Sequence, residues 1–177
     1  MRRQILAFDE AADALLERVR GHEVLDRVMT VATTAGEFSL VWHACSIARG
    51  VARRRPDQVI ALGAGIALES LVVNQGLKRL FGRRRPTESG DERFHIRTPI
   101  TSSFPSGHAS AAAFAACTLI RWDGPRWAPL WGGIAATIAL SRPYVRIHHA
   151  SDVIGGVAVG LAMASAAAPV FRRFGVE

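Results

Sequence analysis

The chain has 177 residues, a length that suits one domain and argues against two. Hydrophobic residues make up 49% of it, and charge gathers in short basic clusters between long apolar stretches, which is typical of a helical membrane protein rather than a soluble bundle. The net charge of +7 suggests nucleic acid, anionic lipid or a phosphate-bearing substrate as a partner. Because only 7% of residues are aromatic and no recognition motif accompanies the arginines, we expect no nucleic acid.

The first predicted element is an amphipathic helix near the N-terminus. Ile5, Phe8, Leu15 and Val19 recur at helical spacing, and acidic residues occupy the opposite side. We expect residues 1–28 to form an interfacial segment in which this helix lies in the membrane interface. Packing of the helix on the protein's own soluble face is an equally good interpretation.

Five candidate membrane spans follow, at residues 31–48, 58–77, 108–120, 128–140 and 153–171. The first is the weakest because it contains Glu37 and His43, and the third is shorter than the roughly 20 residues that a crossing needs. The last is rich in glycine and alanine, which lets helices approach closely. The sequence therefore predicts an all-α fold, a polytopic membrane helical bundle of about five transmembrane helices plus the amphipathic helix. We expect a single membrane-embedded domain over residues 1–177.

Some residues inside or beside these spans carry predictions of their own. Glu69 lies inside the second span, where we expect it to have a structural partner on a neighbouring helix rather than a catalytic role. Cys45 and Cys117 lie in apolar stretches and are interpreted as buried thiols, not as a disulfide or a zinc site. Three tryptophans between residues 122 and 131 are typical of an aromatic belt at the membrane interface.

Three polar clusters lie at the ends of the predicted spans, at residues 78–86, 102–108 and 141–152. The first two bound one loop, and two further crossings separate that loop from the third cluster. Two crossings return the chain to the same face of the membrane, so all three clusters can converge on one site. Residues 78–152 are therefore the expected catalytic region.

A phosphate site needs positive charge and free N–H groups, and the clusters supply both. Lys78, Arg85 and Arg142 are cationic donors, and the planar fork of arginine suits phosphate oxygens. Ser106 and Gly107 open a helix, where free backbone N–H groups and the helix dipole favour an anion. We interpret these five residues as binding the substrate phosphate.

Two histidines and an aspartate supply reactive groups. His108 and His148 can serve as a nucleophile and a general acid near neutral pH. Asp152 follows His148 by four residues and can hold the other ring nitrogen of the imidazole. These three are the candidate catalytic residues.

The three clusters resemble the signature of the type 2 phosphatidic acid phosphatases, which share their site with the vanadium haloperoxidases. The family pattern is Lys, six residues, Arg-Pro; then Pro-Ser-Gly-His; then Ser-Arg, five residues, His, three residues, Asp. Three motifs in this order, with apolar helices between them, are a highly specific signal, although they cover less than half of the chain. The matched positions are Lys78, Arg85, Pro86, Pro105, Ser106, Gly107, His108, Ser141, Arg142, His148 and Asp152.

The resemblance implies a mechanism for a membrane lipid phosphatase. His148 attacks phosphorus and forms a phosphohistidine, His108 protonates the departing oxygen and then activates water, and Asp152 orients His148. The phosphate-binding residues stabilise charge on the equatorial oxygens. The family needs no metal, and we expect no metal site and no cofactor. The expected partners are the bilayer and a lipid substrate bearing a phosphomonoester or pyrophosphate.

Other polar residues have simpler interpretations. The remaining basic residues of the first cluster are expected to be topology signals or headgroup contacts: Arg79, Arg83 and Arg84. Three further histidines are expected to be structural: His22, His43 and His95. The motif spacing selects His148 over its neighbour His149 as the nucleophile.

Two other functions use the same residues. One is a non-catalytic lipid-phosphate binder or transporter, and the less favoured one is a vanadate-dependent haloperoxidase. For a phosphatase, the candidate substrates are phosphatidate, phosphatidylglycerol phosphate, polyprenyl (pyro)phosphates and polyprenyl-linked sugar phosphates, and the loop at residues 87–104 is expected to help choose among them. We expect a multi-pass protein of the cell membrane. Basic residues divide too evenly between the two faces to assign the side of the site, and the sequence carries no signal for an oligomeric state.

Overall fold

The computed structural model describes residues 2–87, 91–94, 96, 98 and 101–177. Within these residues the regular structure is helical, without any strand, so the all-α prediction is confirmed. His95 and part of the loop at residues 87–104 lie outside the described residues. The elements in chain order are α1 (Arg2–Glu17), α2 (Glu23–Ala35), η1 (Glu37–Ser39), α3 (Leu40–Arg53), α4 (Pro56–Leu71), η2 (Val72–Leu77), α5 (Lys78–Leu80), α6 (Gly107–Asp123), η3 (Pro125–Trp127), α7 (Ala128–Tyr144) and α8 (Ala150–Arg173).

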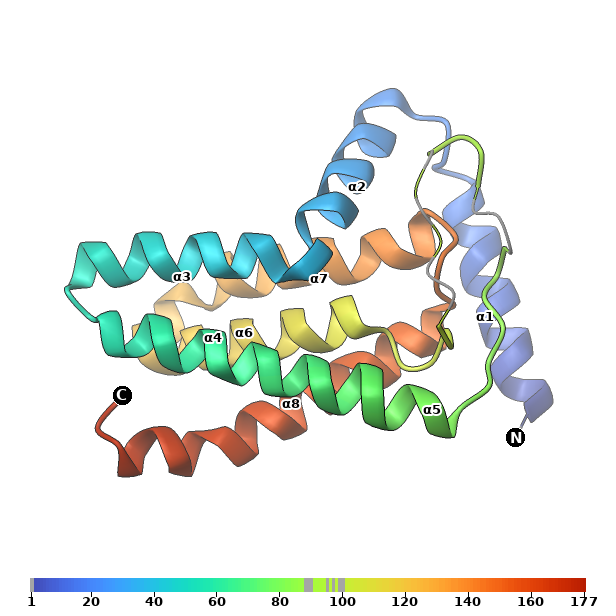
Figure 1. The fold of residues 1–177 in the computed structure, drawn as a ribbon. Coiled ribbons are helices and arrows are strands. Elements are labelled where there is room, and N and C mark those ends of the chain that lie inside the picture. Colours follow the sequence, from blue (N-terminus) through green and yellow to red (C-terminus); the bar gives the residue numbers. More distant parts are fainter. Residues whose placement is uncertain (1, 88–90, 95, 97, 99–100) are drawn as a thin grey trace.

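The bundle is built around α6, with the long helices running lengthwise beside it (Figure 1). Helix α6 is rich in alanine, and most of its residues are buried because α4, α7 and α8 all pack against it. Two glycines of α8, Gly156 and Gly160, allow the closest approach. A side chain at either position would overlap the backbone carbonyl oxygen of Ser106 or of Ser110 on α6. This contact confirms that the glycine-rich last helix packs closely, and it brings the start of α8 beside the start of α6.

Helix α1 lies across one end of the bundle (Figure 1), at the end where α5 and α7 finish and α6 and α8 begin. The amphipathic helix predicted from residue 5 to residue 19 is therefore present, and it packs against α7 and α8. The three polar clusters lie at this same end, as their placement between span ends predicts. We call this the catalytic end of the bundle.

The prediction of one continuous span at residues 31–48 is wrong, because the helix breaks between α2 and α3. Phe38 and Ser39 adopt left-handed backbone angles, with φ of 50° and 56°. Just before them, Gly36 passes so close to the core that a Cβ there would lie 2.8 Å from Cδ2 of His108. This packing turns the chain, so α2 tilts away from the line of α3 (Figure 1).

Two helical stretches of the described chain are long and apolar enough to cross a membrane, Pro56–Leu80 and Ala150–Arg173. The first joins α4, η2 and α5, and the second is α8. They correspond to the second and fifth predicted spans.

The prediction of an aromatic belt is wrong for Trp131. This side chain is buried and donates to Asp123 Oδ2 at 2.9 Å, so it faces protein. Cys45 and Cys117 are free and partly buried against the main core.

Candidate active site

A cavity of about 430 Å³ lies at the catalytic end, between the break before α3, the end of the α4–α5 stretch and the start of α6. Six of the eight predicted site residues line it: Lys78, Arg85, Gly107, His108, Arg142 and His148. They come from all three sequence clusters, so the clusters do converge on one site. Asp152 lies behind His148, and Ser106 lies behind Gly107.

His148 sits in the short loop between α7 and α8 and is only 3% exposed. Arg85 Nη1 lies 3.2 Å from His148 Nε2, and because a guanidinium can only donate, Nε2 is the acceptor and the ring proton is on Nδ1. Burial, together with the positive charges of Arg142 and Arg85, lowers the pKa of His148 to about 3, although Asp152 opposes the shift. The imidazole is therefore neutral near neutral pH, with its lone pair on Nε2.

Asp152 is fully buried in the first turn of α8, on the Nδ1 side of His148. Its Oδ2 accepts hydrogen bonds from Ser103 Oγ at 2.5 Å and from the His149 backbone N–H at 2.8 Å. The distance from Oδ2 to His148 Nδ1 is 3.6 Å, longer than a hydrogen bond, and Ser103 Oγ also lies 3.4 Å from that nitrogen. Asp152 therefore acts on His148 as a nearby charge, with Ser103 beside both.

Three cations face the cavity with few compensating charges. The loop residue Arg85 donates to the backbone carbonyl of Ile147 at 2.7 Å, and burial lowers its pKa. Arg142 is almost fully buried on α7 and donates to Thr33 Oγ1, while its Nε has no hydrogen-bond partner among the described residues. Lys78 stands at the start of α5. Such a concentration of donors favours a multiply charged anion.

The start of α6 supplies a histidine and a close approach for backbone. His108 lies in the first turn, and its Nε2 has no hydrogen-bond partner in the described part of the chain. A Cβ at Gly107 would lie 3.7 Å from Lys78 Nζ, an ordinary contact distance, so the backbone at Gly107 lies beside the ammonium group. Ser106 is fully buried as the N-cap of α6, and its hydroxyl accepts from the Ala109 N–H.

Four residues that the sequence did not assign to the site line its cavity or contact Asp152. Arg83, expected to be a topology signal, donates to Asp152 Oδ1 at 2.6 Å. Ser103 was missed, and its only signal is its place in the second cluster. His43 and Glu69 both line the cavity, and Glu69 Oε1 is buried without a hydrogen-bond partner among the described residues.

Among the described residues, His22 and His149 fall outside the cavity lining. His149 occupies the N-cap of α8, where its side chain and that of Asp152 form a reciprocal capping pair. His22 precedes α2 as its N-cap residue. The described residues hold no group of three or more His, Cys, Asp or Glu side chains arranged to bind a metal ion.

The sequence profile of the PAP2 superfamily matches residues 58–175, about two-thirds of the chain. Among curated proteins, the decaprenylphosphoryl-5-phosphoribose phosphatase of Mycobacterium tuberculosis is 35% identical over 127 residues, which cover 71% of this chain and 68% of that protein. The lipid A 1-phosphatase of Rhizobium etli is 33% identical over 137 residues, covering 71% of this chain and 58% of the relative.

Two solved structures share the fold. A transmembrane PAP2-type phosphatidylglycerolphosphate phosphatase from Bacillus subtilis superposes with a TM-score of 0.77 at 22% identity, covering 96% of this chain and 87% of that one. Aquifex aeolicus LpxE gives a TM-score of 0.73 at 24% identity, with coverage of 90% and 93%. The arrangement of helices is thus that of a transmembrane phosphatase fold.

Proposed function

Because the chain belongs to the PAP2 superfamily and is a membrane lipid phosphatase, we propose that it hydrolyses its substrate through a phosphohistidine on His148. The observation that carries this proposal is the orientation of His148. Its Nε2 accepts from Arg85 in a cavity lined by cations, and its Nδ1 proton faces Asp152. A neutral imidazole held this way is a competent nucleophile.

The proposed reaction has two steps. In the first, His148 Nε2 forms a bond to phosphorus as the bond to the lipid oxygen breaks, and His108 gives that oxygen a proton. In the second, His108 takes a proton from water, the water attacks phosphorus, and the bond to His148 breaks to release inorganic phosphate. The charge on the transferred group is stabilised by the cavity cations and the start of α6, the set assigned from the sequence: Lys78, Arg85, Ser106, Gly107 and Arg142.

We propose a lipid-linked sugar phosphate as the substrate class. Two similar proteins are named for phosphatases of such lipids, a decaprenylphosphoryl phosphoribose and lipid A. The lining of the cavity supports this choice because it holds polar groups beyond the cations and histidines assigned to the phosphate. Glu69, His43 and Asn74 can donate to or accept from hydroxyl groups of a leaving sugar. Replacing Glu69 by Gln should therefore slow hydrolysis of a sugar-phosphate lipid more than that of phosphatidate.

The finer membrane arrangement is also a proposal. Helices α3, α6, α7 and α8 and the α4–α5 stretch each cross the bilayer, with α1 in the interface at the catalytic end, so that residues 1–177 form one multi-pass domain. The support is that α1 turns apolar residues outward: Ile5, Phe8 and Leu15 are 41%, 47% and 60% exposed. Membrane-impermeant labelling of single cysteines at Glu10 and Arg54 should then report opposite sides of the membrane.

The activity is tested with detergent-purified protein in excess chelator, by measuring phosphate release from phosphatidate, phosphatidylglycerol phosphate, polyprenyl phosphates and a polyprenyl-linked ribose phosphate. We expect turnover by the wild type, fastest on the sugar phosphate, and none by His148→Ala. Folded wild-type protein that released phosphate from none of these lipids would instead favour a lipid-phosphate binder or transporter.

A further inference from the structure

Helix α1 has its polar side turned inward. Asp9 is only 5% exposed, whereas four large apolar residues of the same helix lie at the surface: Ile5, Leu6, Phe8 and Leu15. An ordinary surface helix buries its apolar stripe and leaves its carboxylates in water. The acidic face of α1 must therefore be accounted for by contacts with the rest of the protein, and these contacts concern the loop that carries His148. Helix α1 also lies outside residues 58–175, the part matched by the superfamily profile.

Asp9 holds the end of that loop at which α8 begins. The Ser151 backbone N–H donates to Asp9 Oδ1 at 2.8 Å, and the Ser151 hydroxyl donates to Asp9 Oδ2 at 2.8 Å. The first N–H groups of a helix have no partner within it, and a carboxylate there is favoured by the helix dipole. A residue from α1 thus caps the helix that carries Asp152, one position after Ser151.

Arg83 connects the same carboxylate to the catalytic one. Its Nη2 donates to Asp9 Oδ2 at 2.5 Å, and its Nη1 donates to Asp152 Oδ1 at 2.6 Å and to Ser151 Oγ at 2.7 Å. The guanidinium fork therefore lies between two carboxylates that are almost fully buried. Removing any member of such a set leaves a buried charge uncompensated.

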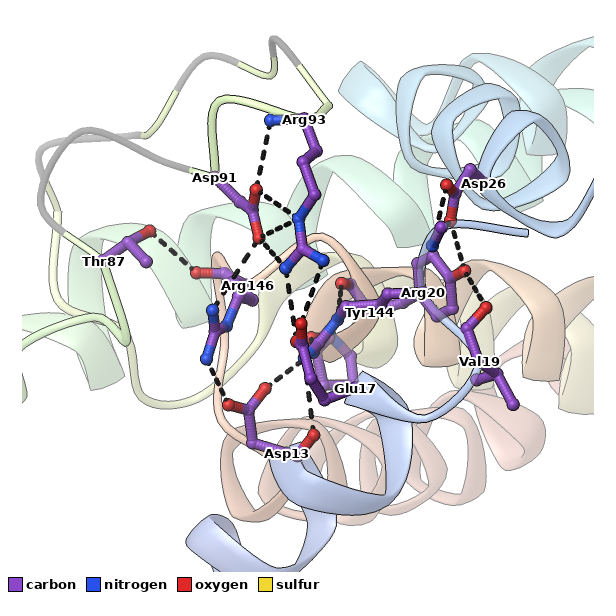
Figure 2. A network of polar contacts seen from close by, with 12 residues as sticks. Asp13, Glu17, Val19, Arg20, Asp26, Thr87, Asp91, Arg93, Tyr144 and Arg146 are labelled. Atoms are coloured by element: carbon purple, nitrogen blue, oxygen red, sulfur yellow. Dashed lines mark hydrogen bonds and ion pairs between the residues drawn. The ribbon is translucent and has the colours of Figure 1, made fainter. Parts of the chain in front are cut away.

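The other end of the loop, where α7 finishes, is held by Arg20 (Figure 2). Arg20 Nε donates to the Tyr144 carbonyl at 2.8 Å, and Nη2 donates to the Pro143 carbonyl at 2.9 Å. Carbonyl groups at a helix C-terminus lack partners within the helix, and a cation there is favoured. Asp13 and Glu17 of α1 accept from Arg20 at 2.6 and 2.7 Å and so fix its position.

The middle of the loop is also tied to α1. Arg146, which has a left-handed φ of 59°, donates to Asp13 Oδ2 at 2.6 Å (Figure 2). On either side of it, Val145 and Ile147 are fully buried in a small cluster that includes Leu16 of α1. Contacts from α1, and from Arg20 in the turn that follows it, therefore reach both ends and the centre of the loop at residues 145–149.

We propose that α1 is a brace for the catalytic loop, in which Asp9 and Arg83 are positioning residues that hold Asp152, and through it His148, in the reactive arrangement. This inference rests on the proposed roles of His148 and Asp152. Neither Asp9 nor Arg83 lines the cavity among the described residues, so they act through Asp152 rather than on the substrate.

The charges around Asp152 give the brace a specific signature. His148 itself faces Arg85 from the segment after α5, Arg142 from α7 and His108 from α6. Asp152 faces Arg83 from the segment after α5, Ser103 from the loop before α6, and His148 and His149 from the loop before α8. Lys78 and Arg85 lie further from Asp152. Loss of the Arg83 charge leaves the Asp152 carboxylate less compensated, which favours protonated His148 and raises its pKa. Loss of the Asp9 charge leaves Arg83 less compensated, which lowers the pKa of His148. The two changes act in opposite directions.

The test compares Asp9→Asn, Arg83→Gln and Arg83→Lys with Glu10→Gln, a control at an exposed position next to Asp9. The full chain in detergent is assayed for phosphate release from the best lipid of the panel above, with kcat, KM, the pH profile of kcat/KM and thermal unfolding. We expect Asp9→Asn and Arg83→Gln to lower kcat by about 10- to 100-fold with little change in KM. The acid limb should move to higher pH in Arg83→Gln and to lower pH in Asp9→Asn. Arg83→Lys should leave the acid limb of the pH profile at its wild-type position, because the charge is kept. Its kcat should still be lower than that of the wild type, because an ammonium group cannot bind two carboxylates in the geometry of a guanidinium.

Wild-type kcat in both Asp9→Asn and Arg83→Gln would overturn the brace. Losses of kcat that follow the fall in unfolding temperature, without opposite shifts of the acid limb, would also overturn it. Hydrogen exchange of residues 145–153 tests the brace without measuring activity. Asp9→Asn and Arg83→Gln should both exchange faster in this segment than Glu10→Gln. Unchanged exchange would also contradict the brace. An inactive wild-type protein whose exchange pattern follows the brace would count against the proposed function alone.

Discussion

The two ends of the bundle both bury charged side chains, but they treat them differently. At the end away from the active site, Asp123 accepts from Arg49 at 2.7 Å and from Trp131 at 2.9 Å, and Arg49 also donates to Gln58 at 2.6 Å. Each of these polar groups has a partner, and the network joins α3, α4, α6 and α7.

At the catalytic end, the buried polar atoms that face the cavity do not all have partners. Arg142 Nε, His108 Nε2 and Glu69 Oε1 have none among the described residues. Cations that are left together in a cavity cost stability and are useful only when an anion binds. This difference agrees with the proposal that the unpaired end performs the chemistry, and it predicts that the paired end contributes more to stability. Substitutions at the two ends should therefore separate stability from activity.

Among the substitutions that compare the two ends, the largest effect is expected for Arg142→Gln. Arg142 is one of the donors proposed for the transferred phosphoryl group, and its loss should lower kcat by a factor of about 10² to 10³. Because the substitution also relieves repulsion among the cavity cations, the unfolding temperature should stay the same or rise. Phosphate-release kinetics and thermal unfolding of the same preparation check both expectations. A large fall in unfolding temperature would mean that Arg142 is mainly structural.

Arg49→Gln should lower stability and leave kcat nearly unchanged, the opposite of Arg142→Gln. Breaking a buried ion pair leaves Asp123 uncompensated and costs about 3 kcal/mol, the low end of the usual range, because Arg53 still lies 3.3 Å from Asp123. The kcat of the protein that remains folded should be within twofold of wild type. A substantial loss of kcat at a temperature where the variant is fully folded would contradict the division between the two ends.

Gly160→Ala tests the packing that brings the catalytic ends of α6 and α8 together. The added methyl group would overlap the Ser110 carbonyl oxygen, so the helices must separate at a cost of about 1–3 kcal/mol. Both stability and kcat should fall, because His108 and Asp152 lie on the two helices. Gly132→Ala is the matched control, since a Cβ there meets nothing within 4 Å.

The smallest effect is expected in the outer part of the brace. Arg93 donates to Glu17 at 3.0 and 3.2 Å (Figure 2), and the hydrogen bond from Arg93, followed by the one from Arg20, lowers the pKa of Glu17 from 4.5 to about 2. A lowered carboxyl pKa stabilises the folded state above about pH 4.5, and this contribution is lost as pH falls toward 2. The pair is half exposed, and Arg93 also donates to Asp91, so Arg93→Gln should cost under about 1 kcal/mol at pH 7 and progressively less as pH falls toward 2. A larger loss in thermal unfolding at pH 7 would show that the pair is not screened by solvent.

The catalytic motifs could be predicted because their chemistry depends on residue type and spacing. Lys78, Arg85, His108, Arg142 and His148 lie around one cavity, as the topology of span ends requires. The helices α6, α7 and α8 were also predictable, because apolar runs bounded by glycine, proline and charged residues mark their ends. These features are local in the sequence, so local patterns are enough to find them.

The remaining features arise from contacts between distant segments. The break at Phe38 follows from the packing of Gly36 on His108, which an apolar run cannot reveal. The inward acidic face of α1 depends on arginines 74 and 133 residues away, Arg83 and Arg146. The carboxylate partners of Arg83 lie on α1 and α8, far from it in the sequence. The sequence therefore predicts only a topology signal at this position.

The most direct test of the central claim is to trap the covalent intermediate. Wild-type protein is mixed with a polyprenyl-linked ribose phosphate carrying ³²P in its terminal phosphate, quenched in alkali and digested, and the labelled peptide is identified. We predict acid-labile, alkali-stable label on the peptide that contains His148, and none in His148→Ala. Turnover with no label on any histidine, or label that persists in His148→Ala, would contradict the proposal that His148 is the nucleophile.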